Sequence, residues 1–170
     1  MNITFLGATK TVTGSNFLLE GAGKKILIDC GLYQGKAAEE RENYSDFPYN
    51  VQDIDFLLLT HAHIDHSGKI PALVKNGFRG KIYTTLATTK LCEIMLLDSA
   101  HIQEFEAKWK NRKAKRQGKD EIEPMYTGDD VNKTLTLFSP CDYDKEYKIF
   151  DDVKIKFIDA GHLLGSASIE

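Results

Sequence analysis

Short apolar runs separated by polar turns dominate the first half of the chain. Runs of this length, bounded by charged residues or glycine, are typical of strands rather than helices. A glycine-rich turn at 21–23 predicts a hairpin with a three-residue loop between its neighbouring strands. We predict strands over 3–6, 15–20, 25–28, 55–59 and 81–84.

Helical spacing is clearest over 88–109, where large apolar residues recur three and four positions apart. We also predict a helix that opens over 67–71 and runs to about 75, a helix over 128–137, and a short helix or mobile loop over 36–44. A second hairpin is expected over 145–150 and 153–158, turning at Asp151 and Asp152, and 168–170 resembles part of a further strand. This alternation predicts a mixed α/β protein whose helices cover a sheet.

Composition narrows the class of protein. The chain has 170 residues, about the length of one domain, and 42% of them are hydrophobic, enough for a core. A formal net charge of −3 argues against a globally basic nucleic-acid binder. The sequence contains neither a membrane-length apolar run nor a signal peptide. The widely spaced Cys30, Cys92 and Cys141 predict reduced thiols in a cytoplasmic protein.

A cluster of metal-binding side chains follows the predicted strand 55–59 directly. His61, His63, Asp65 and His66 occur within six positions, although the chain has only five histidines. Imidazole and carboxylate groups bind zinc and similar transition metals. Because the four side chains follow one another so closely, we expect them to serve two adjacent metals, which suits phosphoryl chemistry.

Two more distant residues are candidates for the same site. His162 lies in a glycine-framed loop and offers a third imidazole; alone it would be read as a turn residue. Asp29 ends the predicted strand 25–28, where a buried carboxylate is costly unless it has a partner. We expect Asp29 to accept the free N–H of a ligand imidazole, and the alternative is a residue that starts a turn.

A dense basic run covers 108–119 and begins beside Trp109. Cations could contact a phosphate backbone while the indole stacks on a base. The alternative is a solvated helix end. Trp109, Lys113, Lys115 and Arg116 are the candidate RNA contacts.

These residues resemble the metallo-β-lactamase superfamily, whose hallmark is a His-x-His-x-Asp-His motif after a buried strand. The finer resemblance is to its β-CASP branch of RNA-processing enzymes, and it rests on residues 6–9, 12–15, 98–104 and 160–167. Asp29 matches the first motif of the superfamily and His162 matches the third.

The resemblance implies an αββα sandwich, represented mainly by its N-terminal half with a helical insertion. It implies hydrolysis of RNA phosphodiesters by a zinc-activated water, with two zinc ions in the full-length parent. His61, His63 and His162 would hold one ion. Asp65 and His66 would serve the other and act in catalysis, and Asp29 would support them.

One departure from the family pattern is informative. The later bridging Asp, the β-CASP domain and the C-terminal metal motifs have no counterpart in residues 1–170. We therefore expect this chain to be the N-terminal part of a longer RNA-binding enzyme. We expect it to be inactive alone and to associate through an unpaired strand edge. Two other functions stay open: a small-molecule hydrolase acting on thioesters or lactones, and a non-catalytic RNA-processing subunit.

Overall fold

Two sheets form the framework of the protein. The computed structural model describes residues 1–150 and 153–170. The larger sheet has the order β1-β2-β3-β4-β5-β6, antiparallel from β1 to β3 and parallel from β3 to β6. Its strands are β1 (Asn2–Phe5), β2 (Phe17–Gly21), β3 (Lys24–Ile28), β4 (Phe56–Leu58), β5 (Lys81–Thr85) and β6 (Phe138–Cys141). The smaller, antiparallel sheet contains β7 (Glu146–Phe150), β8 (Val153–Asp159) and β9 (Ala167–Ile169).

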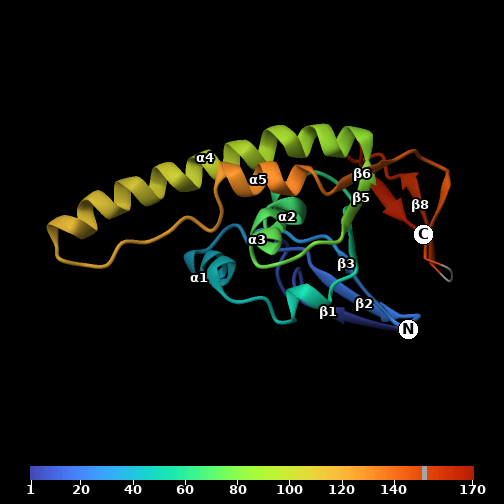
Figure 1. Cartoon of the computed structure of the whole chain (residues 1–170), viewed down its shortest axis with the longest axis horizontal. Coiled ribbons are helices and arrows are strands. Elements are labelled where there is room, and N and C mark those ends of the chain that lie inside the picture. Colours follow the sequence, from blue (N-terminus) through green and yellow to red (C-terminus); the bar gives the residue numbers. More distant parts are fainter. Residues whose placement is uncertain (151–152) are drawn as a thin grey trace.

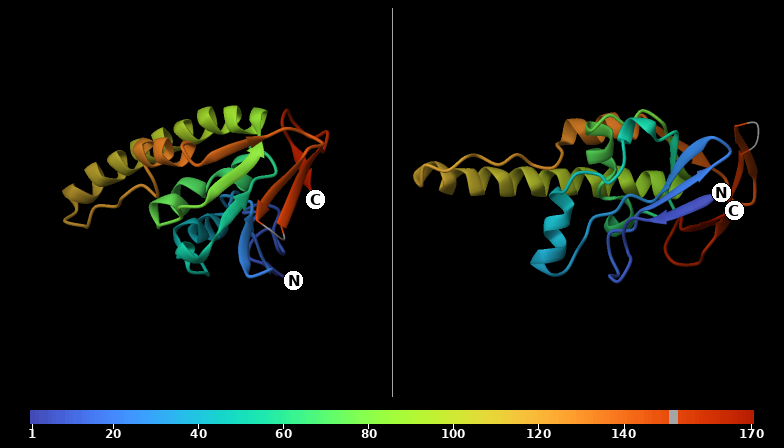
Figure 2. Two further views of the ribbon diagram at one scale, coloured as in Figure 1. Left: turned by 45° about the vertical axis from the view of Figure 1, so that its right-hand side comes forward. Right: turned by 90° about the horizontal axis from the view of Figure 1, so that it is seen from below.

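The helices lie mainly in the connections between the parallel strands. They are α1 (Ala37–Arg41), α2 (Ile64–Ser67), α3 (Ile70–Lys75), α4 (Leu86–Arg116) and α5 (Gly128–Leu135), with short 3₁₀ turns at Glu42–Tyr44 and Val51–Asp53. The long helix α4 projects well beyond the rest of the molecule (Figures 1 and 2). In the described part of the chain, no helix is both long enough and apolar enough to cross a membrane.

The core lies on both faces of the larger sheet. Leu57 points to the helical side, where it joins Leu73 and Leu96 from α3 and α4. Its neighbours Phe56 and Leu58 join the second cluster, which packs against the smaller sheet. Because adjacent strand residues face opposite ways, a strand covered on both faces must be apolar throughout. The layers confirm the predicted α/β class.

Two helix starts are stabilised by side chains. The hydroxyl of Thr85 accepts the backbone N–H of Thr88 at the start of α4. Thr127 and Asp130 form a reciprocal capping box at the start of α5. Such caps satisfy backbone donors that have no partner within the helix.

Several element boundaries differ from those predicted. Helix α4 is longer than 88–109 and includes most of the basic run, and the helical turn α2 and the strand β6 were not predicted. The hairpin formed by β7 and β8 matches the prediction, but its expected turn at Asp151 and Asp152 lies outside the described residues.

The first hairpin is tighter than predicted. Gly21 pairs with Lys24, so the loop contains only Ala22 and Gly23. Both have positive φ angles, 50° and 68°. This is the backbone geometry that a two-residue hairpin turn needs to match the twist of its strands. Alanine is strained there, because its Cβ disfavours the left-handed region.

We therefore expect Ala22→Asn to raise the free energy of unfolding by about 0.5–1 kcal/mol, because asparagine tolerates this conformation and alanine does not. Ala22→Val should lower it by about 1 kcal/mol, since a β-branched side chain is worse there. Urea denaturation of the two variants beside the wild type measures both changes. Equal midpoints for all three proteins would contradict the strain at this turn.

Candidate metal centre

Asp29 organises the polar end of the larger sheet. This residue is only 2% exposed and follows β3 directly. The carboxylate accepts the backbone N–H of Thr60 at 2.9 Å, the Thr60 hydroxyl at 3.0 Å and the Ser15 hydroxyl at 3.1 Å. The Nδ1 atom of His66 lies 2.6 Å from Oδ2. Four contacts thus compensate the cost of burying the charge.

The backbone around α2 holds the motif against the end of β3. The N–H of Cys30 donates to the carbonyl of His66, and that of Ser15 donates to the carbonyl of Asp65. Gly31 lies so close to this turn that a Cβ atom there would overlap the Asp65 carbonyl oxygen. Only glycine permits this approach.

Three imidazoles converge at one point. His63 Nδ1 lies 3.2 Å from His61 Nε2 and 3.1 Å from His162 Nε2. One ligand atom from each ring can be chosen so that all three atoms lie within 4.8 Å of one another. Three nitrogens that face one point could hold a single divalent ion with an open position left for water or substrate.

His162 reaches this point from the other sheet. It lies in the loop between β8 and β9, which is anchored to the start of α4. The carbonyl of Gly165 accepts both the Thr85 hydroxyl at 2.7 Å and the Thr88 hydroxyl at 2.9 Å. Gly165 has a φ of +90°, and a Cβ atom there would meet the Thr88 backbone. The Ser166 hydroxyl accepts the N–H of Leu163 and so closes the loop.

Asp65 and His66 form a second group beside the three imidazoles. The rings of His61 and His66 are 4.0 Å apart between centroids. His66 turns Nδ1 toward Asp29, and its Nε2 lies 3.8 Å from the Asp65 carboxylate. This pair could supply a nitrogen and an oxygen to a second ion.

The surroundings shift the pKa values of two histidines in opposite directions. Burial, with the neighbouring His66, His63 and His162, lowers the pKa of His61 to about 4. Burial also opposes charge on His66, but its hydrogen bond to Asp29 and the charges of Asp29 and Asp65 outweigh this and raise its pKa. His61 is therefore neutral at pH 7, the form in which imidazole binds a metal.

Sequence reasoning did not assign roles to four hydroxyl side chains at this centre. Thr60 contacts both Asp29 and Nδ1 of His61, the latter at 2.9 Å. Its position directly before the motif was the only local signal. The contacts of Ser15 with Asp29, and of Thr85 and Thr88 with the His162 loop, join residues far apart in sequence and leave no local pattern.

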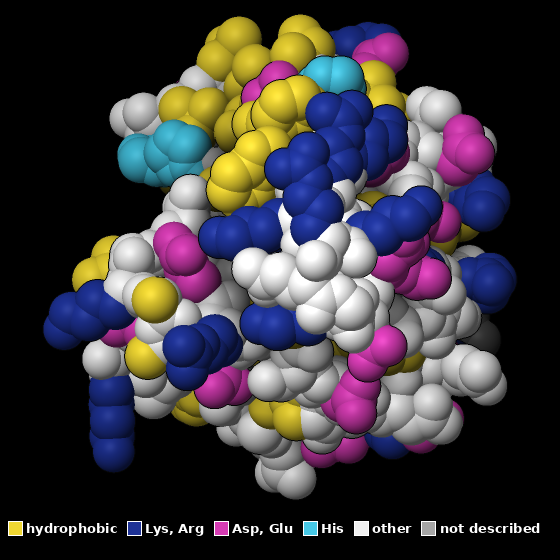
Figure 3. Space-filling view, turned by 90° about the vertical axis from the view of Figure 1, so that its left-hand side faces the viewer, with side chains coloured by type: hydrophobic (Ala, Val, Ile, Leu, Met, Phe, Trp, Pro, Cys, Tyr) yellow, Lys and Arg dark blue, Asp and Glu magenta, His cyan; other side chains and the backbone are white. Residues whose placement is uncertain are grey.

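The candidate RNA contacts lie elsewhere. Trp109, Lys113, Lys115 and Arg116 are all on the distal part of α4, and all four are exposed. Viewed from the α4 end, Lys and Arg side chains lie beside hydrophobic ones on this face (Figure 3). The structure does not bring these residues to the histidines.

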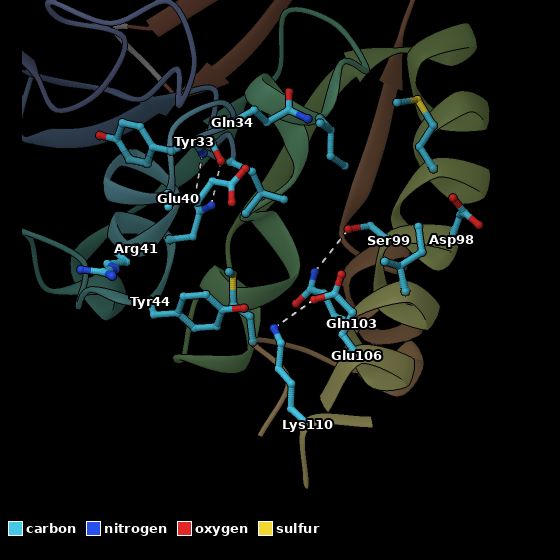
Figure 4. Close-up of a pocket in the computed structure, with 17 residues that line it drawn as sticks. Tyr33, Gln34, Glu40, Arg41, Tyr44, Asp98, Ser99, Gln103, Glu106 and Lys110 are labelled. Atoms are coloured by element: carbon cyan, nitrogen blue, oxygen red, sulfur yellow. Dashed lines mark hydrogen bonds and ion pairs between the residues drawn. The ribbon is translucent and has the colours of Figure 1, made fainter. Parts of the chain in front are cut away.

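A groove of about 600 Å³ separates α1 from α4 and includes Ile64, the neighbour of His63, in its lining (Figure 4). Arg41 and Lys110 contribute positive charge to it. Acidic side chains in the same lining outnumber them: Glu40, Asp98 and Glu106. The groove is therefore not a continuous basic track, in contrast to the end of α4.

Comparison with known proteins finds relatives whose sequences align with almost the whole of this chain. It is 37% identical over 169 residues to Ribonuclease TTHA0252 of Thermus thermophilus, covering 99% of this chain and 34% of that protein. It is 36% identical over 169 residues to Transcription termination factor FttA of Methanosarcina mazei, covering 98% of this chain and 24% of that protein. The chain thus spans about a third or less of the length of these relatives.

The fold has neighbours among solved structures. A metallo-β-lactamase from Cronobacter sakazakii superposes with a TM-score of 0.57 at 20% identity, covering 98% of this chain and 50% of that one. A model of the metallo-β-lactamase superfamily domain matches residues 18–169. The chain therefore belongs to the metallo-β-lactamase superfamily.

Proposed function

We propose that this chain carries the zinc-binding residues of a hydrolase that cleaves RNA phosphodiesters. The observation that carries the proposal is the convergence of His61, His63 and His162, whose ligand atoms lie within 4.8 Å of one another. Packing alone gives no reason to bring three imidazole nitrogens face to face, whereas a shared cation does. Family membership independently implies a divalent metal.

In this proposal the three imidazoles hold one zinc ion, and Asp65 with His66 serves a second. Zinc, when bound, would polarise a phosphoryl oxygen and lower the pKa of a water molecule. In this proposal the Asp65 carboxylate, 3.8 Å from His66 Nε2, would accept a proton from the attacking water. His66 keeps its Nδ1 proton directed at Asp29, which leaves Nε2 available as a ligand atom.

Asp29 and Thr60 act as positioning residues for this site. The Thr60 hydroxyl contacts Nδ1 of His61 and the Asp29 carboxylate together. With Nδ1 occupied by this contact, His61 presents Nε2 to the other imidazoles. Hydrogen bonds of this kind fix the orientation of a ligand ring and raise its basicity.

Two observations favour RNA as the substrate. A relative with 37% identity is named a ribonuclease, and the alignment includes almost the whole of this chain. The exposed basic end of α4 also offers a surface for phosphates that a small thioester or lactone would not need. A non-catalytic subunit would have no reason to retain the histidines.

We expect the purified protein to bind zinc, and His63→Ala to weaken that binding more than roughly 100-fold, beyond the 10–100-fold typical of residues that only orient ligands. Binding should also weaken as the pH falls, because protons compete with zinc for the imidazole nitrogens. Titration calorimetry from pH 5 to pH 8 measures both effects.

The matched control for zinc binding is His101→Ala. His101 is an exposed histidine on α4, outside the group of three. The His101→Ala variant should bind zinc with the same affinity as the wild type. Equal affinity in His63→Ala and His101→Ala would overturn the metal centre.

The basic run should add affinity for single-stranded RNA that depends on salt. Changing Lys113, Lys115 and Arg116 to Ser should reduce the slope of log affinity against log salt by about 0.7 for each phosphate that the variant no longer neutralises. Fluorescence anisotropy at several salt concentrations measures the slope. The control changes three exposed lysines outside α4, Lys133, Lys145 and Lys154. Identical slopes in both triple variants would leave the run as a solvated helix end.

Zinc and RNA should also bind cooperatively, because a phosphate oxygen would complete the open position of the metal. We expect zinc to raise RNA affinity roughly five- to tenfold, about 1–1.4 kcal/mol, in the wild type and not in His63→Ala. The same anisotropy assay with and without zinc tests this. A site built for thioesters or lactones would give zinc binding without any change in RNA affinity.

A further inference from the structure

A row of exposed apolar side chains runs along α4. Ile94 is 70% exposed, Phe105 66% and Trp109 59%. They lie on the side of the helix away from its buried residues Cys92, Leu96, Ala100 and Ala107. We name this row the α4 stripe. Its members are Leu86, Ile94, Leu97, Phe105 and Trp109, whereas the exposed Ile102 lines the groove beside α1.

The α4 stripe continues onto the loop that carries His162. Leu164 in that loop is 76% exposed, and the adjacent Gly165 packs against Thr88 in the first turn of α4. Figure 3 shows hydrophobic side chains gathered over the upper part of the molecule, where α4 lies in Figure 1. Several exposed apolar side chains gathered on one water-exposed helix indicate an interaction site.

We propose that the α4 stripe is the contact between two copies of this chain, packed as antiparallel helices around a twofold axis. The charges on α4 favour this arrangement. The first half, Leu86 to His101, carries one lysine and two acidic residues, whereas Ile102 to Arg116 carries six cations and two acidic residues. Antiparallel packing sets the basic half of each helix against the other half of its partner, and parallel packing would set the two basic halves together.

The apolar positions define the register. An axis near His101 brings Leu97 close to the partner's Phe105 and Ile94 close to the partner's Trp109. Aromatic residues are enriched at the centre of protein interfaces. The same axis lays the basic end of each α4 over the start of the partner helix, beside the loop that carries His162.

The contact has the size of a weak, reversible interface. Aromatic side chains present about 150–250 Å² each, so Phe105 and Trp109 alone leave roughly 100–150 Å² each to be covered. With Leu86, Ile94 and Leu97 added, the exposed apolar surface falls short of the ~800 Å² per partner of a standard interface, which fits a dimer that dissociates on dilution. This proposal stands on the shape and charge of α4 and does not depend on the metal centre.

Sedimentation velocity of the wild type tests the assembly. We expect a dimer at about 100 µM that dissociates on dilution, and a monomer for Phe105→Glu at the same concentration. The control is Ile3→Glu, which introduces the same charge at a half-exposed apolar residue of β1 and should leave the dimer intact. Circular dichroism verifies that both variants fold. A wild type that stays monomeric at about 100 µM overturns the proposal.

Disulfide trapping tests the register separately. The native cysteines Cys30, Cys92 and Cys141 are buried, so a cysteine placed on the surface is the reactive one. His101→Cys should form a covalent dimer on mild oxidation, because the axis brings the two copies of this position together. Lys133→Cys on α5, also exposed, should not. Equal trapping of the two variants, or none with His101→Cys, overturns the antiparallel arrangement. A monomer whose RNA affinity falls in Phe105→Glu would assign the stripe to RNA instead.

Discussion

The buried carboxylate of Asp29 is the contact on which the rest of the centre depends. It joins the end of β3, the start of the motif at Thr60, the opening loop at Ser15 and the ring of His66. Removing one partner of such a buried, hydrogen-bonded charge leaves the others unsatisfied, which typically costs several kcal/mol. Asp29 is separated from these partners by up to 37 residues in the chain, and its carboxylate therefore holds the segments in one arrangement.

Sheet topology explains why these groups meet. Strands β3 and β4 are parallel neighbours with Ile28 opposite Leu58, so their carboxyl ends lie at the same edge of the sheet. Asp29 and Thr60 follow those ends, and their side chains are brought together by the register alone. His162 is different, because it comes from the smaller sheet and its loop is tied to α4 through Gly165. The centre thus lies where both sheets and the helical layer meet.

Local signals in the sequence were enough to predict part of the fold and part of the candidate site. The apolar run before His61 predicted the central strand, and the spacing of the histidines predicted a metal centre at its end, where the structure brings three imidazoles together. Strand β6 was missed because it contains Pro140, which normally argues against a strand and is tolerated here at the edge of the sheet. The end of α4 was missed because its basic residues have no apolar period, although lysine, arginine and alanine favour helix. The contacts of Thr60 and Ser15 depend on tertiary structure and could not be predicted locally.

Because His63 and His162 are far apart in the sequence, an ion bound to both would also affect the conformational entropy of the unfolded chain. The two imidazoles are 99 residues apart in sequence, and only 3.1 Å separates their nearest ring nitrogens. An ion bound by both residues would be a cross-link that closes most of the chain into a single loop. Closing so long a loop in the unfolded chain restricts it more than closing a short one, by an amount comparable to a long-range disulfide, about 4–5 kcal/mol in the simplest model. Loss of the ion would therefore loosen the junction between the two sheets as well as empty the centre.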